Sequence, residues 1–79
     1  MKGRFTLPYA VLQRLRMIDV LLATLGEFDR SVLVEYFGIS IPQASADISL
    51  YKNLAPNNVT YSSSRKRYVA AVSFARVWD

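Results

Sequence analysis

Hydrophobic residues in the first third of the chain recur at intervals of four and three, which is the spacing of one face of an α-helix. These residues are Val11, Leu15, Ile18, Leu22 and Leu25. The pattern predicts a first helix over residues 9–25, with Pro8 in its first turn and Thr6 as its N-cap. Gly26 follows the last hydrophobic position and supplies the stop.

This first helix carries more hydrophobic surface than one stripe requires, because Leu12, Met17 and Leu21 lie beside the stripe. Arg14 and Arg16 are predicted to lie off it. Two interpretations of the extra hydrophobic surface remain open. It is either a wide core face in a small domain or a surface that meets a second copy of the protein.

Residues 29–53 predict two further helices joined by a tight turn. The shorter helix spans about residues 31–37, with Asp29 or Arg30 at its boundary, and gives the core four side chains. These are Val32, Leu33, Tyr36 and Phe37. Gly38 then allows the left-handed backbone of a sharp turn. The longer helix, residues 41–53, begins from a Ser-x-x-Gln capping box formed by Ser40 and Gln43, with Pro42 in its first turn.

The longer of these helices has an unusual solvent face. Ala44, Ile48 and Tyr51 recur at helical spacing and are predicted to point inward. The outward residues are small or carry an amide, and they are Gln43, Ser45, Ala46 and Ser49. A surface helix ordinarily favours Lys and Glu, whereas Ser and Gln suit the edges of bases. Asp47 is the exception, and we expect it to pair with a neighbouring arginine such as Arg30.

The C-terminal third predicts a β-hairpin over residues 59–72. Val59 to Tyr61 alternates as a strand, and Arg67 to Val72 returns as a second strand. Tyr61 and Tyr68 are expected to pack toward the body, as are Phe74 and Trp78 at the end of the chain. The tip carries serines followed by three consecutive basic residues. Such a tip is either simply solvated or donates hydroxyl and cationic groups to phosphate oxygens.

The order of long helix, short helix, turn, capped helix and basic-tipped hairpin is the layout of a winged helix-turn-helix. The predicted fold class is therefore mainly α with a small β-hairpin, made of three helices plus a wing in a single domain over residues 1–79. In this fold the third helix enters the major groove of DNA. The residues predicted to contact double-stranded DNA are Ser40, Pro42, Gln43, Ser45, Ala46, Ser49, Lys52, Ser64, Arg65, Lys66 and Arg67.

Composition narrows the function further. The chain has 79 residues, 52% of them hydrophobic, which suffices for a packed core. Its net charge of +4 is compatible with a polyanionic partner without requiring one. The sequence contains neither cysteine nor histidine, so it has no thiol nucleophile and lacks the commonest general base, and it has no glycine-rich phosphate loop. We therefore expect no enzyme, no metal and no cofactor, and assign no small-molecule ligand to this domain.

The expected location is the cytoplasm, in association with the nucleoid and with no membrane partner. No hydrophobic run is long enough to span a bilayer, and no cleavable signal pattern follows the basic residues of the N-terminus. The alternative function is a protein–protein interaction module built on the same scaffold. The weakly charged face of the third helix suits a protein partner as well as it suits bases.

Three segments, FGISIPQASADISLY, LAPNNVTY and KRYVAAVSF, resemble the N-terminal winged-helix domain of WYL-domain transcriptional regulators. The likeness is greatest to the repressors that lie beside bacterial phage-defence operons. It extends from about Leu12 to Phe74 and is most specific from Ile39 to Tyr51. The resemblance implies a homodimeric, DNA-binding transcriptional repressor that acts on an inverted-repeat operator.

By position, the resemblance assigns Ser40, Gln43 and Ser45 to the groove and Lys66 to the wing. Regulators of this family continue into WYL and C-terminal domains, whereas this sequence stops at Asp79. The chain is therefore either an excised domain or a stand-alone protein. In both cases ligand sensing is not assigned to these residues.

Overall fold

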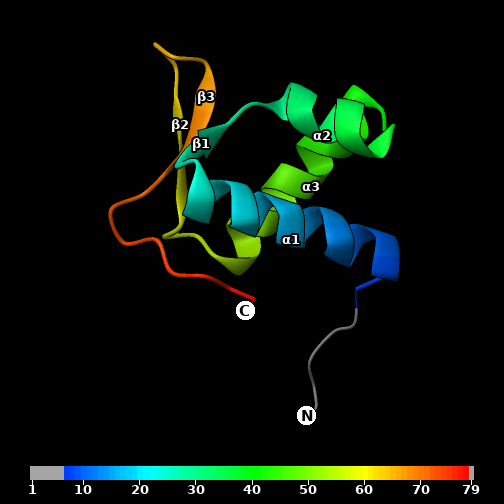
Figure 1. Cartoon of the computed structure of the whole chain (residues 1–79), viewed down its shortest axis with the longest axis horizontal. Coiled ribbons are helices and arrows are strands. Elements are labelled where there is room, and N and C mark those ends of the chain that lie inside the picture. Colours follow the sequence, from blue (N-terminus) through cyan, green and yellow to red (C-terminus); the bar gives the residue numbers. More distant parts are fainter. Residues whose placement is uncertain (1–6, 79) are drawn as a thin grey trace.

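The structure is a computed structural model that describes residues 7–78 of the chain. Three helices and three short strands follow one another in a mixed order (Figure 1). They are α1 (Tyr9–Thr24), β1 (Glu27–Phe28), α2 (Arg30–Phe37), α3 (Ile41–Leu54), β2 (Val59–Ser62) and β3 (Arg67–Ala70). The predicted fold class, a winged helix-turn-helix of three helices plus a wing, is confirmed.

The wing is fastened to the helical body by a strand that precedes α2. The sheet has the order β1-β3-β2 and is antiparallel throughout. Within the hairpin, Val59 lies opposite Ala70 and Ser62 lies opposite Arg67. Gly26 turns the chain from α1 into β1 with a positive φ of 78°, and its carbonyl accepts a hydrogen bond from the Ala70 backbone N–H. Glu27 and Phe28, which lie between Gly26 and α2, thereby form the edge strand β1 of the sheet.

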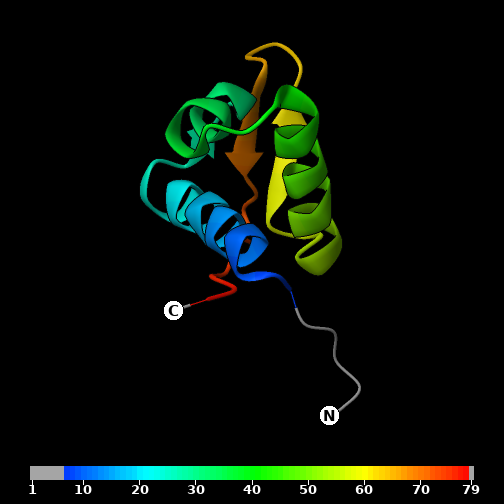
Figure 2. The ribbon, with the colours of Figure 1, turned by 90° about the vertical axis from the view of Figure 1, so that its right-hand side faces the viewer.

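The core lies where α1, α3 and the sheet meet. Figure 2 shows the two helices side by side with the strands behind them. The fully buried side chains come from all three layers, and the largest are Tyr51, Phe28, Leu15, Ile18 and Leu22. The ring of Phe28 stacks on that of Tyr68 at 5.4 Å between centroids. Phe74 and Trp78 pack against this cluster as expected.

The first helix differs from its prediction at both ends. Pro8 is the N-cap residue and precedes the helix, with no side-chain cap, and Thr6 lies outside the described residues. Leu25 is 68% exposed because the helix ends at Thr24 and Leu25 is its C-cap. Arg14, predicted to lie off the hydrophobic stripe, is buried. Its burial depends on a partner on α3, described below.

The core face of α2 is rotated by one residue from the prediction. Leu33 is buried, and Phe37 lies one turn further along the same stripe, partly buried against the core. Val32 and Tyr36, also predicted in the core, are exposed, Tyr36 by 69%. A helix of two turns packs on the body through one stripe, so the neighbouring stripe is left at the surface.

Candidate nucleic-acid interface

The start of α3 is fixed by local backbone chemistry. Gly38 ends α2 in the left-handed conformation, with φ 66° and ψ 33°. Ser40 is the N-cap of α3, and its Oγ accepts a hydrogen bond from the Gln43 backbone N–H at 3.2 Å. The predicted capping box is only half formed, because the Gln43 side chain turns to Asp47 instead of back to Ser40. Pro42 occupies the first turn, where no intrahelical N–H is needed.

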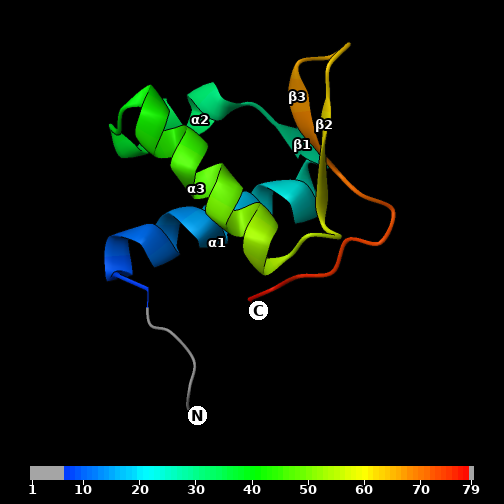
Figure 3. The ribbon, with the colours of Figure 1, turned by 180° about the vertical axis from the view of Figure 1, so that it is seen from behind.

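Most of the residues predicted to contact DNA from α3 share one exposed side of the helix. Ala44, Ile48 and Tyr51 are buried, as predicted. The exposed set is Pro42, Gln43, Ala46, Ser49 and Lys52, and Ser45 is half-buried. Seen from behind, α3 crosses in front of α1 and no other element covers this side (Figure 3). The structure therefore presents a helix face with one charge, Lys52, at its C-terminal end.

Asp47 pairs with an arginine as predicted, but its partner is Arg14 of α1 and not Arg30, so the named partner was wrong. Asp47 Oδ2 lies 2.5 Å from Arg14 Nε, and Asp47 Oδ1 accepts from Nη2 at 3.3 Å. Both side chains are buried. Asp47 stands on the inward side of α3, between Ala44 and Tyr51, where a lone carboxylate would lose its hydration. Only a buried cation satisfies it there, and Arg14 lies across the α1–α3 interface.

This buried ion pair also holds an exposed amide of α3. Gln43 Nε2 donates a hydrogen bond to Asp47 Oδ1 at 3.0 Å. Because a carboxylate only accepts, the contact fixes which end of the amide faces inward. The second Nε2 hydrogen and the Oε1 lone pairs stay available to solvent. These are the groups that pair with adenine N7 and N6 in a bidentate contact.

Arg30, the first residue of α2, is a candidate that the sequence reasoning missed. It is exposed, and its Nη1 donates to the Ser45 Oγ at 3.0 Å. The contact places a cation beside the outward face of α3. One signal was available, because a positive charge at a helix N-terminus opposes the helix dipole. An arginine at this position therefore does not stabilise the helix through its dipole.

The wing tip is held by its own serines and by two acids of the body. The Lys66 N–H donates to the Ser62 carbonyl at 2.7 Å, and the Arg65 N–H donates to the Ser62 Oγ at 3.3 Å. Arg65 and Arg67 both contact Glu27, and Arg67 also reaches Asp29. Lys66 has a positive φ of 57°, which is uncommon for a residue with a side chain. Within residues 7–78 it forms no ion pair.

Tyr61 completes the wing differently from the prediction. It was expected to pack toward the body with Tyr68, but it is 49% exposed while Tyr68 is half-buried. Its ring contacts Tyr68 at 4.9 Å between centroids. The antiparallel register places these two residues directly opposite each other, so Tyr61 forms the outer layer of an aromatic stack that begins at Phe28.

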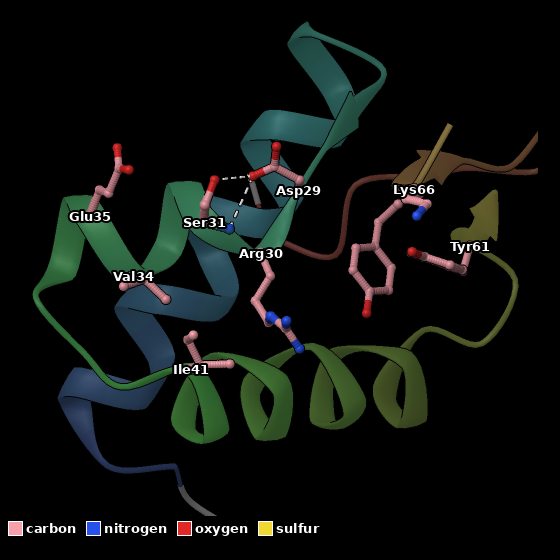
Figure 4. Close-up of a pocket in the computed structure, with 9 residues that line it drawn as sticks. Asp29, Arg30, Ser31, Val34, Glu35, Ile41, Tyr61 and Lys66 are labelled. Carbon is pink, nitrogen blue, oxygen red and sulfur yellow. Dashed lines mark hydrogen bonds between the residues drawn. The ribbon is translucent and has the colours of Figure 1, made fainter. Parts of the chain in front are cut away.

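A groove of about 470 Å³ runs between α2, the start of α3 and the wing. Arg30 lines it from α2, and Lys66 and Tyr61 line it from the hairpin, while the exposed Ile41 stands at the start of α3 (Figure 4). Asp29 also lines it, but as the N-cap of α2 it accepts from the Ser31 N–H at 3.0 Å. The Ser31 hydroxyl is also its donor, and with Arg67 nearby the pKa of Asp29 lies below its usual value.

Charged side chains of both signs line the groove. Arg30 and Lys66 border it together with Asp29 and Glu35, and the outward face of α3, whose one charge is Lys52, lies beside it. No group of three His, Cys, Asp or Glu side chains in the described part of the chain could hold a metal ion. No helix among residues 7–78 combines the length and hydrophobicity needed to cross a membrane.

Comparison with known proteins was made at the level of sequence. The family model of the BrxR transcriptional regulator winged helix-turn-helix domain matches residues 10–78. The DNA-binding transcriptional repressor CapW of Escherichia coli (strain KTE188) is 42% identical over 77 residues. CapW of Pseudomonas aeruginosa is also 42% identical over 77 residues, and CapW of Stenotrophomonas maltophilia is 45% identical over 62.

The coverage of these alignments is unequal. They cover 98% of this chain for the first two relatives and 78% for the third. The aligned part is 26% of the length of the first two relatives and 21% of the third. The chain thus spans about a quarter of the length of the curated relatives it matches.

Proposed function

The chain belongs to the family of BrxR transcriptional regulator winged helix-turn-helix domains, and from that premise we propose that it binds double-stranded DNA and regulates transcription as a repressor. The single observation that supports this most is the exposed side of α3. Its side chains are small, hydroxylic or amide-bearing, with Lys52 at the C-terminal end. Such a surface reads base edges without the charge repulsion or bulk that Glu or long side chains would bring. The relatives named as DNA-binding repressors support the same role.

In this proposal α3 lies in the major groove and its N-terminal half reads bases. Gln43 is the principal reader because its amide is exposed and oriented by Asp47. Ser45 and Ser49 follow Gln43 along the same helix and offer hydroxyl groups. Lys52 follows at the end of the helix, where a cation meets a phosphate and does not read a base.

The groove beside α3 takes one sugar–phosphate strand. Arg30 and Lys66 border it from α2 and from the wing, so a phosphate between them meets a cation from each side. Contacts of this kind fix the register of the protein on the duplex and carry no sequence information. They also make the affinity fall with salt, because counterions are released from the DNA when phosphates are neutralised.

We further infer that two copies bind an inverted repeat. A helix-turn-helix reads only a few base pairs, and two-fold pairs of such domains place their recognition helices about 34–36 Å apart, one turn of DNA. The exposed Val20 and Tyr36 border a hollow between α1 and α2, away from the outward face of α3. That surface is free for protein contacts while α3 is bound.

Binding is tested by fluorescence anisotropy with two labelled duplexes. One carries the DNA upstream of the gene that encodes the chain, and the other is the same DNA with its sequence shuffled. We expect both to bind at low salt, the upstream duplex more tightly, and log K to fall linearly with log salt. Absence of salt-sensitive binding at micromolar protein contradicts the proposal and favours the alternative, a protein–protein interaction module.

A further inference from the structure

The three basic residues of the wing are not equivalent, because one glutamate of the body holds two of them. Glu27 Oε1 lies 2.5 Å from Arg65 Nη2, and Glu27 Oε2 lies 3.3 Å from Arg67 Nε. Arg67 Nη1 also reaches Asp29 Oδ2 at 3.4 Å. Each oxygen of the Glu27 carboxylate therefore faces its own arginine, and Lys66 between them forms no ion pair in the described part of the chain.

The sheet explains why these charges meet. β1 pairs with β3 so that Glu27 stands opposite Val69, which makes Arg67 its diagonal neighbour across the strands. Arg65 reaches the same carboxylate from the tip. The contact does not depend on long side chains meeting by chance, since strand pairing fixes the separation of the backbones. Glu27 is only about a quarter exposed, whereas the Arg65 side chain is 60% exposed.

A guanidinium that faces a carboxylate has less to offer a phosphate. The carboxylate neutralises its charge and takes its N–H donors, in the same geometry that a phosphate oxygen would use. To bind DNA through Arg65 or Arg67, the phosphate must displace Glu27 or share the arginine with it. For Arg67 the contact with Glu27 is one of charge, because its buried Nε lies 3.3 Å from Glu27 Oε2 without an aligned hydrogen bond.

We propose that Glu27 competes with DNA phosphate for Arg65 and Arg67 and so limits the sequence-independent affinity of the wing. This inference rests on the proposed DNA-binding function. It leaves Lys66 as the wing cation that meets phosphate first. Because Glu27 does not touch the outward face of α3, it weakens binding to every sequence by the same factor. The ratio of specific to non-specific affinity is therefore unchanged, and every complex with DNA dissociates more readily.

The test uses the whole chain with Glu27→Gln and a labelled duplex of shuffled sequence. Releasing two arginines adds phosphate contacts, each of which steepens the slope of log K against log salt by about 0.9. We expect a steeper slope by about one to two contacts and binding at low salt that is tighter by about threefold or more. Circular dichroism establishes that the variant is folded.

Glu35→Gln is the matched control. It removes the same charge from α2 at the rim of the same groove, but Glu35 forms no ion pair within residues 7–78. If only the net charge matters, the slope of log K against log salt changes equally in both variants. If the arginines are released, the slope steepens only in Glu27→Gln. Equal slopes for the two variants, or weaker binding by Glu27→Gln, overturn the inference. Wild-type protein that fails to bind the duplex overturns the proposed function as well.

A second comparison has one arm in the wild-type background, which does not depend on the stability of the Glu27 variant. In the wild-type background, Arg65→Gln is expected to weaken binding to the shuffled duplex by less than Lys66→Gln, because Arg65 is already occupied. In the Glu27→Gln background, Arg65→Gln should remove most of the gain. An Arg65→Gln loss as large as that of Lys66→Gln in the wild-type protein shows that Glu27 does not compete.

Discussion

At the scale of single residues, the exposed amide of Gln43 depends on two charges that DNA never meets. Arg14 holds Asp47, and Asp47 accepts from the Gln43 amide. A free glutamine on a helix surface samples several rotamers and loses that freedom on binding. The Asp47 contact removes part of this loss before binding occurs. The orientation of the Gln43 amide and the α1–α3 interface are therefore linked through one carboxylate.

The first prediction concerns Gln43 itself. Gln43→Ala is expected to reduce discrimination between the upstream duplex and the shuffled one by about 1–3 kcal/mol, the range for one bidentate base contact. The slope of log K against log salt should stay as in the wild type, since no phosphate contact is lost. Asn57→Ala, which removes an exposed amide from the turn after α3, serves as the control. Unchanged discrimination in Gln43→Ala would show that α3 does not read bases there.

The second prediction concerns the ion pair beneath Gln43. Asp47→Ala strands the buried Arg14 charge and is expected to lower the free energy of unfolding by about 3–5 kcal/mol, measured by urea denaturation. The double variant Arg14→Met, Asp47→Leu replaces both charges with apolar groups. It should recover most of that stability, but Gln43 loses the hydrogen bond to Asp47 that orients its amide. An ion pair that matters only for folding would leave base discrimination in the double variant at the wild-type value.

At the scale of elements, the turn between α2 and α3 sets where the outward face of α3 points. Gly38 has φ 66°, and a Cβ built there meets no atom within 4 Å. Gly38→Ala therefore meets only a backbone penalty, about 1–2 kcal/mol for a left-handed residue with a side chain. We expect this loss in the free energy of unfolding and no change in DNA discrimination. Gly38→Asn should lose less, since asparagine tolerates this conformation.

The same turn shows what the sequence could predict. A local backbone conformation is indicated by each of three residues, Gly38, Ser40 and Pro42. The end of α2 and the start of α3 were therefore predicted to within one residue. The inward face of α3 was likewise correct at Ala44, Ile48 and Tyr51. All of these depend on residues close together in the chain, where spacing and capping chemistry suffice.

What the sequence could not predict depends on contacts between distant elements. Asp47 was assigned to Arg30, 17 positions away, whereas Arg14 is its partner across 33 positions. The arginines of the wing gave no sign in the sequence that Glu27 holds them, because that contact requires the pairing of β1 with β3. The number of charged residues in the sequence does not show which of them form ion pairs. The candidate interface was therefore predictable in its outline on α3 and not in the electrostatics of its wing.

At the scale of the whole molecule, one buried carboxylate of α1 joins this helix both to α3 and to the C-terminal segment. Asp19 of α1 is fully buried, and its Oδ1 accepts from the Tyr51 hydroxyl of α3 at 2.6 Å. Its Oδ2 accepts from Arg76 Nε at 2.9 Å and from the backbone N–H groups of Val77 and Trp78. The C-terminal segment is thus fixed on the same group that anchors α3.

Burial alone raises the pKa of Asp19, but the hydrogen bonds from Tyr51, Arg76 and the backbone outweigh it and hold the pKa below the usual value of 3.8. Burial and the neighbouring carboxylate also raise the pKa of the Tyr51 hydroxyl, so it keeps its proton. In the unfolded chain Asp19 binds protons more readily than in the fold. Its contribution to stability is therefore complete above pH 3.8 and is lost as pH falls through its lowered pKa.

Tyr51→Phe tests this network through its pH dependence. Loss of the hydroxyl removes one donor from Asp19 and the acceptor of Asn58 Nδ2, and should lower the free energy of unfolding at neutral pH by about 1–3 kcal/mol. The folded pKa of Asp19 rises toward its unfolded value, so the variant has less stability to lose in acid. Urea denaturation from pH 7 down to pH 2 should show that the difference in the free energy of unfolding between variant and wild type narrows as Asp19 is protonated.

Tyr61→Phe is the control, because its hydroxyl is on the exposed wing, and it should show no such difference at any pH. A Tyr51→Phe difference of constant size would mean that Asp19 is not the linked group.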